Sequence, residues 1–341
     1  HHYAILGQLA DAFDLSALRK AYQHVLGAAH PALFQPADKA GETALRKAIL
    51  QHLIEIRELT GTVQQVLIAS GIQNHLMLLA AVHKPRTIAF IEPLFDRAKN
   101  VFDLLDIQLV PCADFAMLCQ VEADWMYLSP SNSYPGGDVL SIKDRLDIIE
   151  HARQCGAFII EDDYNHLFRY NAYQIPAIQG LAKGERVIYI GAFSRTMPIS
   201  MRISYMVLPL AMLTRFPSDL PLAQTVSTID QLAMADFMTS GAYTRQLRKL
   251  SGFAKRHNAL VSSLVEQHKP ASIDVWGLAS NMHMMMTAHD ARTCQRIKAL
   301  LTTQNLYYRP FENPPHTLLF PYGGLDETTL SASLIKVFRG V

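Results

Sequence analysis

Three short polar stretches hold the side chains of this chain that could do chemistry, and each directly follows an apolar, strand-like run. They are the turn 71–73, the acidic triplet 162–164 and the loop after Ile190. Ligands of open α/β sheets bind at the carboxyl ends of the strands, so stretches in these positions are expected to converge. Their convergence favours one shared pocket for an anion or a cofactor over three unrelated polar sites.

The loop after Ile190 lies within the segment RVIYIGAFSRTMPISMRISYMVLP, residues 186–209. Two apolar runs enclose a loop of small residues that carries a hydroxyl at Ser194 and two cations, Arg195 and Arg202, but no acid. A buried strand that ends in such a loop is suited to holding an anion. The segment therefore predicts a binding site for a negatively charged group.

The turn Gly71-Ile72-Gln73 passes straight from an apolar strand, 66–70, into a helix predicted over 74–82. Backbone N–H groups at a helix start have no partner within the helix and point toward whatever lies there. The turn can therefore cradle a phosphate. An ordinary tight strand–helix turn has the same pattern.

Strands and helices alternate along the part of the chain that must position these stretches. Apolar strands are predicted at 66–70, 87–91, 108–111, 125–128, 158–161, 187–190 and 203–208. Such runs with helices between them favour an α/β layer with a largely parallel sheet. We expect an N-terminal segment packing on the small domain, a large α/β domain, an interdomain helical segment and a small α+β domain, at 1–43, 44–222, 223–265 and 266–341.

The helical pattern 223–265 is broken only around Gly241 and Gly252. Basic residues line its second half, namely Arg245, Arg248, Lys249, Lys255 and Arg256. A row of this kind is typical of a solvated or partner-facing helix flank.

Composition narrows the class of protein. The 341 residues are 50% hydrophobic, which is enough for a sizeable core, and the net charge of +1 gives no general electrostatic case for binding nucleic acid or membranes. The four cysteines lack metal-ligand spacing, so no metal site is expected and a reduced, cytoplasmic protein is the simpler interpretation. No apolar run is long enough to span a bilayer.

The order of the motifs resembles fold type I pyridoxal-phosphate enzymes, the family of aspartate aminotransferase. More narrowly, it resembles the aminotransferase-like domain of MocR-type transcription regulators of the GntR superfamily. The resemblance covers the chain from about residue 12 onward and rests on ALRKAILQHLIEIREL, SGIQ, SPSNSYPGG, EDDYNHLFRY, AFSRT with Arg202, and QLAMADFMTSGAYTRQLRKL. It implies an aminotransferase-like α/β fold with a mostly parallel, seven-stranded sheet and a smaller C-terminal domain.

The resemblance also implies roles for individual residues. Asp162 matches the acid that faces the pyridine nitrogen, and Tyr164 the phenol that bonds the ring hydroxyl. Arg202 and the turn 71–73 match the phosphate site, and Phe95 the aromatic that stacks on the ring. Ser194 and Arg195 belong to the cofactor-facing loop. Four of these residues have a structural alternative. Asp162 could be a turn-capping acid, Tyr164 a core tyrosine, Arg202 an ion-paired arginine and Phe95 a core phenylalanine.

Several positions depart from the family. The lysine that forms the Schiff base is Arg195 here, and a guanidinium stays protonated and cannot attack an aldehyde. Lys183 precedes the strand and should not reach the loop. The hydroxyl residue before the lysine is Ala192, the glycine before the stacking aromatic is Leu94, and the carboxylate-binding arginine corresponds to Leu319. We therefore expect no transaminase activity.

The resulting hypothesis is an effector-sensing and dimerisation domain of a MocR-type regulator. It would form a homodimer, bind a small anionic effector or non-covalent pyridoxal phosphate, and contact DNA only through a winged helix-turn-helix that this chain lacks. The cofactor is expected to bind without a covalent bond or to be absent. The alternatives are a pyridoxal-phosphate-dependent aminotransferase, or a lysine-to-arginine variant of one, and a structural dimerisation module with a collapsed pocket.

Overall fold

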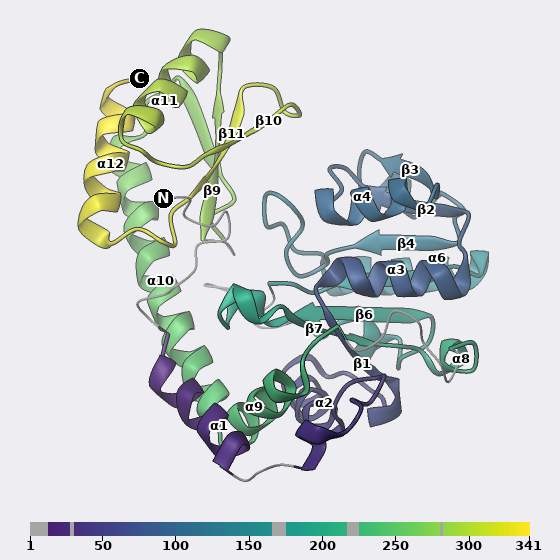
Figure 1. Ribbon diagram of the computed structural model, residues 1–341. Coiled ribbons are helices and arrows are strands. Elements are labelled where there is room, and N and C mark those ends of the chain that lie inside the picture. The colour runs from purple at the N-terminus through teal and green to yellow at the C-terminus, as the bar shows by residue number, and fades with distance from the viewer. Residues whose placement is uncertain (1–12, 28–30, 166–174, 217–224, 280–281) are drawn as a thin grey trace.

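The computed structural model describes residues 13–27, 31–165, 175–216, 225–279 and 282–341 (Figure 1). These residues form two sheets connected by the long helix α10 (Ala242–His268). Figure 1 shows α10 running from the helices beside the larger sheet to those that cover the smaller one. Within the described ranges, no helix combines the length and the apolar character that crossing a membrane requires.

The larger sheet has seven strands in the order β1-β7-β6-β5-β4-β2-β3. Strand β7 runs antiparallel to both of its neighbours, and the other pairs are parallel. The strands are β1 (Val66–Ser70), β2 (Thr87–Ile91), β3 (Gln108–Cys112), β4 (Trp125–Leu128), β5 (Phe158–Asp162), β6 (Val187–Ala192) and β7 (Ile203–Val207). The expected mostly parallel, seven-stranded sheet is confirmed.

Both faces of this sheet are buried. On β4, Trp125 and Tyr127 pack into one apolar cluster while Met126 and Leu128 pack into another. Successive strand side chains point to opposite faces, so a continuously apolar strand needs cover on both sides. The helices of this part are α1 (Leu15–Gly27), α2 (Thr43–Arg57), α3 (Ile72–His83), α4 (Asp96–Leu104), α5 (Phe115–Leu118), α6 (Ile142–Cys155), α7 (Ile178–Leu181), α8 (Leu210–Leu213) and α9 (Thr228–Thr239).

Short 3₁₀ turns complete this part of the chain, at η2 (Pro31–Phe34), η3 (Val63–Gln65), η4 (Phe193–Arg195) and η5 (Ile199–Met201). The smaller sheet has four antiparallel strands in the order β10-β11-β9-β8. They are β8 (Ile273–Trp276), β9 (His283–Ala288), β10 (Arg309–Phe311) and β11 (Thr317–Pro321), and they pack with α10, α11 (Ala291–Thr303) and α12 (Glu327–Arg339).

The observed helices differ from the predicted helical pattern 223–265 at one of its two glycines. Gly241 separates α9 from α10 and has a φ of 74°, in the left-handed region. Gly252 lies inside α10, which continues without a break. A glycine in a helix interior costs about 1 kcal/mol but keeps its N–H, so a helix that packs well continues through it. Residues 223 and 224 lie outside the described ranges.

Helix α1 belongs to the N-terminal segment 1–43, which we expected to pack on the small domain, but this helix lies against α9. Residues 1–12 and 28–30 lie outside the described ranges, so for them the expectation stays a prediction. The buried α1 residues Leu18, Ala21 and Val25 join the apolar cluster that contains β1, β7 and α9. The apolar stripe of an amphipathic helix fits any complementary face, so the sequence of α1 alone did not select its neighbour.

Candidate functional site

The turn after β1 and the start of β7 form one polar cluster. The Gly71 N–H donates to the Ser204 hydroxyl (2.8 Å), which donates to the Ala69 carbonyl (2.7 Å). Gly71 has a φ of 87°, and a Cβ there would lie 2.6 Å from Nη2 of Arg202. The Arg202 guanidinium therefore lies directly over the start of α3, where the unpaired N–H groups of Ile72 and Gln73 begin the helix.

Asp162 ends β5 and is only 5% exposed. The Tyr127 hydroxyl, from the neighbouring strand β4, donates to its Oδ2. Burial raises the pKa of Asp162 to about 7, which the Tyr127 hydrogen bond opposes and the Asp163 charge reinforces. The carboxyl is thus poised to accept a proton or a cationic partner near neutral pH.

Tyr164 and Arg195 bring the loops after β5 and β6 together. The guanidinium carbon of Arg195 lies 5.3 Å from the centre of the Tyr164 ring, a cation–π distance. The Tyr164 hydroxyl donates to Oδ1 of Asn132, in the loop after β4 (3.0 Å). Ser194 precedes Arg195 in η4 and is half-buried.

The strand pairing makes these clusters neighbours. Ser204 of β7 is paired with Ala192 of β6, and Ile190 of β6 with Asp162 of β5. The turn 71–73, the Arg195 loop and the Asp162 carboxyl therefore lie side by side at the carboxyl ends of β1, β6 and β5. This end of the strands is the edge of the sheet that carries the site. The expected convergence of the polar stretches is present in the structure.

Phe95 lies farther along the same edge. It lines a small cavity of about 40 Å³ together with Tyr127 and Tyr134, and its ring meets Tyr134 edge-on at 5.8 Å. Phe95 thus connects to Asp162 through Tyr127. Ile72 packs its side chain against the core, so only its backbone faces the turn. Among the described residues, the buried Oε1 of Gln73 has no hydrogen-bond partner.

A buried ion pair between Arg57 and Asp163 lies next to the site. The Nε of Arg57, at the end of α2, donates to Oδ2 of Asp163 (2.7 Å), and Nη2 donates to the Ser131 hydroxyl (2.8 Å). The Tyr189 hydroxyl also donates to Oδ2 of Asp163 (2.6 Å). Burial alone would lower the pKa of Arg57, but Asp163 and its neighbours raise it above its usual value. The pair fixes the ends of β4, β5 and β6 relative to α2.

The smaller sheet reaches the same edge. Nε2 of His283, on β9, donates to the Pro135 carbonyl (2.9 Å). Burial lowers the pKa of His283 to about 4; the Pro135 bond opposes this shift and the Arg195 charge adds to it. The imidazole is therefore neutral at physiological pH. Arg309, on β10, pairs with Asp96 of α4 and lies 5.9 Å from the Tyr134 ring.

Leu319, at the position that corresponds to the family's carboxylate-binding arginine, lies in the smaller sheet. It is 1% exposed and is paired with Met285 on one side and with Arg309 on the other. Lys183 is exposed and lies before β6, at the end of the strand opposite Arg195. Within the described residues, no group of three or more histidines, cysteines and acids could hold a metal ion.

Several residues of this site were missed by the reasoning from sequence. Tyr127 and His283 carry no spacing signal, because tertiary packing alone brings them to the site. Asn132 lies within the string SPSNSYPGG, which marked its loop but gave Asn132 no role. Arg57 had a signal: it continues the buried stripe of Ile49 and Leu53 at helical spacing, where an arginine needs a buried partner.

Known proteins resemble this chain in sequence. The family model Aminotransferase class I and II matches residues 8–320. The uncharacterized HTH-type transcriptional regulator YdeL of Bacillus subtilis is 30% identical over 81% of this chain and 62% of its own length. The probable rhizopine catabolism regulatory protein MocR of Rhizobium meliloti is 26% identical over 85% of this chain and 62% of its own. The chain thus spans less than two thirds of these relatives.

The fold also matches solved structures. A crystal structure of Pyrococcus horikoshii kynurenine aminotransferase superposes with a TM-score of 0.84, covering 99% of this chain and 89% of that one. The sequences are 17% identical, so the likeness establishes a shared fold.

Proposed function

Because the chain belongs to the aminotransferase class I and II family, and relatives across most of its length are named as transcriptional regulators, we propose that it is the effector-sensing domain of a MocR-type regulator. In this proposal the domain binds a small anionic ligand without a covalent bond and forms a homodimer. DNA is bound by a helix-turn-helix elsewhere in the full-length protein.

The observation that carries the proposal is the placement of Arg195. Its guanidinium lies over the Tyr164 ring, in the turn that follows β6. By the resemblance of the AFSRT loop, this residue corresponds to the family's reactive lysine. A guanidinium attracts an anion and does not add to an aldehyde. The same loop that serves covalent catalysis in the family is thus proposed to serve reversible binding here.

The surrounding groups fit pyridoxal phosphate at two of its ends. For a phosphate, Arg202 supplies a cation and the start of α3 supplies backbone N–H groups. For a protonated ring nitrogen, Asp162 supplies a buried carboxyl. Tyr164 would bond the ring hydroxyl and Phe95 would pack on the ring. When bound to an amine, this cofactor supplies an electron sink. The residues at the third end, Arg195 and Ala192, fit non-covalent binding alone.

A titration with pyridoxal phosphate tests the proposal. We expect a rise in melting temperature without an adduct after borohydride treatment. Removing a charge-assisted phosphate contact costs about 1.5–3 kcal/mol, so Arg202→Ala should weaken binding by about 10–100-fold. The Arg195→Lys variant should gain a borohydride-trapped adduct at residue 195, which would show that the rest of the pocket is intact.

The second candidate is an aminotransferase, favoured by the fold and by the buried Asp162 carboxyl. An adduct trapped on any lysine of the unmodified chain would support it and contradict our proposal. If neither pyridoxal phosphate nor inorganic phosphate raises the melting temperature, a structural module with a closed pocket is the better description.

The regulatory part of the proposal needs the full-length protein. We expect its affinity for operator DNA to change when the ligand occupies the pocket, because a ligand shifts an equilibrium by its difference in affinity for the two states. Equal DNA affinity with and without a bound ligand would contradict a sensing role.

A further inference from the structure

The basic flank of α10 forms a charged surface together with α1. Five cations of α10 fall within about 120° of the helix circumference, and all are exposed. They are Arg245, Arg248, Lys249, Lys255 and Arg256. Glu266 is the one acid of the helix and lies near its far end. Helix α1 adds Arg19 and Lys20 and contains no acid.

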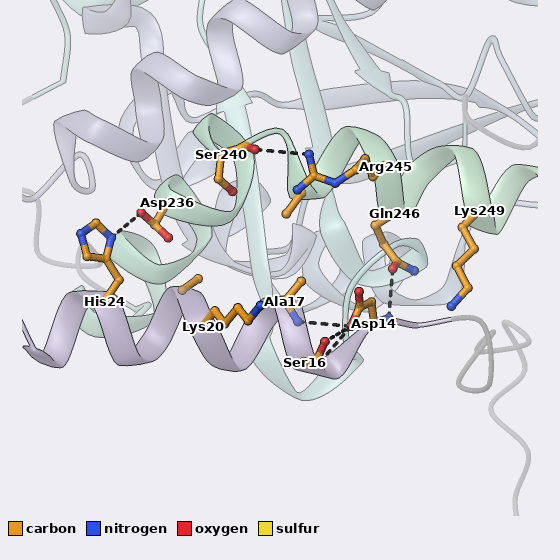
Figure 2. A pocket seen from close by; sticks show the side chains of 12 residues that line it. Asp14, Ser16, Ala17, Lys20, His24, Asp236, Ser240, Arg245, Gln246 and Lys249 are labelled. Atoms are coloured by element: carbon orange, nitrogen blue, oxygen red, sulfur yellow. Dashed lines mark hydrogen bonds and ion pairs between the residues drawn. The ribbon is translucent and has the colours of Figure 1, made fainter.

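A groove of about 610 Å³ lies between the two helices (Figure 2). Lys20 from α1 and Arg245 and Lys249 from α10 stand on its two sides. Small side chains, Ala17 and Ala242 among them, line the groove between the cations. The backbone of an elongated partner could therefore approach the helices closely.

Close ion pairs do not neutralise these cations within the part of the chain that the structure describes. None of the seven basic residues forms an ion pair there, and the Arg245 guanidinium only donates to the Ser240 carbonyl (3.4 Å). A row of exposed like charges repels itself unless an anion or salt neutralises it.

The two acids that line the groove are already engaged. Asp14 accepts hydrogen bonds from the Ser16 hydroxyl (2.6 Å) and from the N–H groups of Ala17 (3.2 Å) and Ser16 (3.0 Å) at the start of α1. The Ser16 hydroxyl contributes most to lowering the pKa of Asp14, followed by these N–H groups, and the Lys249 charge adds to the shift. Asp236 accepts from Nδ1 of His24 (2.7 Å). The groove therefore presents its cations to an outside partner.

We propose that this surface, defined by Arg19, Lys20 and the five α10 cations, binds the phosphate backbone of double-stranded DNA. The row from Arg245 to Arg256 is about 16 Å long, and one DNA strand carries a phosphate roughly every 3.4 Å along the axis, so the row matches about five phosphates. The choice of DNA among polyanions rests on the proposed regulator function. The surface would contact DNA independently of sequence, beside the operator.

The chain of 341 residues can be tested directly by fluorescence anisotropy with a labelled duplex of arbitrary sequence. We expect weak binding with a slope of log affinity against log salt of about −3 or steeper, because each neutralised phosphate contributes about −0.9. With three phosphates neutralised, raising the salt from about 50 to 200 mM would lower the affinity about 40-fold.

The decisive variant combines Lys20→Glu, Arg245→Glu and Lys249→Glu, which line the groove. It should lose most of the binding, and the slope should fall by about 3 units. The matched control combines Lys143→Glu, Arg292→Glu and Arg296→Glu on α6 and α11, which changes the net charge equally and should lose far less. Circular-dichroism melting checks both folds, and glutamine at the same three groove positions should give a smaller loss in the same direction.

Three results would overturn the inference: no salt-dependent binding by the unmodified chain, equal losses in the groove and control variants, or competition by polyglutamate as strong as that by duplex at equal charge. The groove variants keep every residue of the pocket. A thermal shift with pyridoxal phosphate should therefore persist in them. If the unmodified chain shows this thermal shift but does not bind DNA, the surface is rejected and the proposed ligand binding stands.

Discussion

At the scale of single residues, the site is governed by charges held out of water. Asp162 and Asp163 are adjacent and both buried, yet their partners differ. Asp163 faces the Arg57 guanidinium, whereas Asp162 faces the neutral phenol of Tyr127. An unpaired buried carboxylate is destabilising, so the two acids play different parts: one anchors the strands, and the other is available to a ligand.

The raised pKa of Asp162 predicts a pH dependence of stability. The folded-state pKa of about 7 exceeds the ordinary value of about 4, so between these values the folded state holds a proton that the unfolded state releases. Stability therefore falls as pH rises through this range, by about 1.4 kcal/mol per pH unit for this group. Asp162→Asn should remove that slope.

Urea unfolding at pH 5 and pH 6 gives the change in unfolding free energy between the two pH values, which is compared between the unmodified chain and Asp162→Asn. The control is Glu122→Gln at an exposed position, which should show the same change as the unmodified chain. A slope that is unchanged in Asp162→Asn would mean that the carboxyl is not desolvated in the ligand-free protein.

At the scale of elements, the pairing of β7 with β1 and β6 assembles the site. Because β7 runs antiparallel, its first residues lie beside the last residues of both neighbours. This places Ser204 against the Gly71 N–H and Arg202 over the turn. A parallel β7 would have put the same residues at the opposite end of the sheet.

Gly191 tests how tightly this pairing is packed. A Cβ at Gly191 would lie 2.5 Å from the Tyr205 ring, which is held by Tyr189 and Phe193. We expect Gly191→Ala to destabilise the protein by about 1–3 kcal/mol, since the ring must shift within a packed core. Urea unfolding provides the measurement.

The same substitution at Gly252 provides the control with the opposite sign. Gly252 lies inside α10, where the nearest atom to an added Cβ is Nη1 of Arg256 at 3.8 Å. Gly252→Ala should stabilise the protein by roughly 0.5–1 kcal/mol, because alanine restricts the unfolded chain and favours the helix. Equal effects of the two substitutions would contradict the packing argument.

At the scale of the whole molecule, contacts around Tyr134 join the two sheets. Tyr134 lies between Phe95 of the larger part and Phe311 of β10, with ring centroids 5.8 and 5.9 Å away. Arg309 pairs with Asp96 across the same junction. The loop that carries Tyr134 also carries Pro135, the partner of His283. The candidate pocket and the smaller sheet are therefore mechanically connected through this loop.

We expect Arg309→Ala to loosen this junction with little loss of global stability. The pair is partly exposed, so its contribution to the unfolding free energy should stay below about 1 kcal/mol. Hydrogen exchange should become faster in 309–311 and 133–137, because local opening is governed by local contacts. Arg153→Ala, which breaks a surface pair with Glu185, should leave exchange in both segments unchanged.

Much of the fold followed from local pattern. The alternation of apolar runs and helices predicted the α/β class. The capping box of Ser141 and Asp144 at the start of α6 is likewise a local feature of the sequence. The continuation of α10 through Gly252 was not predictable, because packing along the whole helix outweighs one unfavourable residue. Strand β10 is hard to predict from local pattern because its three residues include Pro310, which lacks a donor.

For the site, the sequence by itself determined which stretches to consider and which chemistry residue 195 itself can do. An arginine at this position cannot form a Schiff base in any conformation, because a guanidinium is not a nucleophile at working pH. The tertiary structure alone decided the neighbours: Tyr127 on Asp162, Tyr164 beneath Arg195, and Arg202 over Gly71. Strand order and register bring together residues far apart in the chain, and no local pattern encodes those distances.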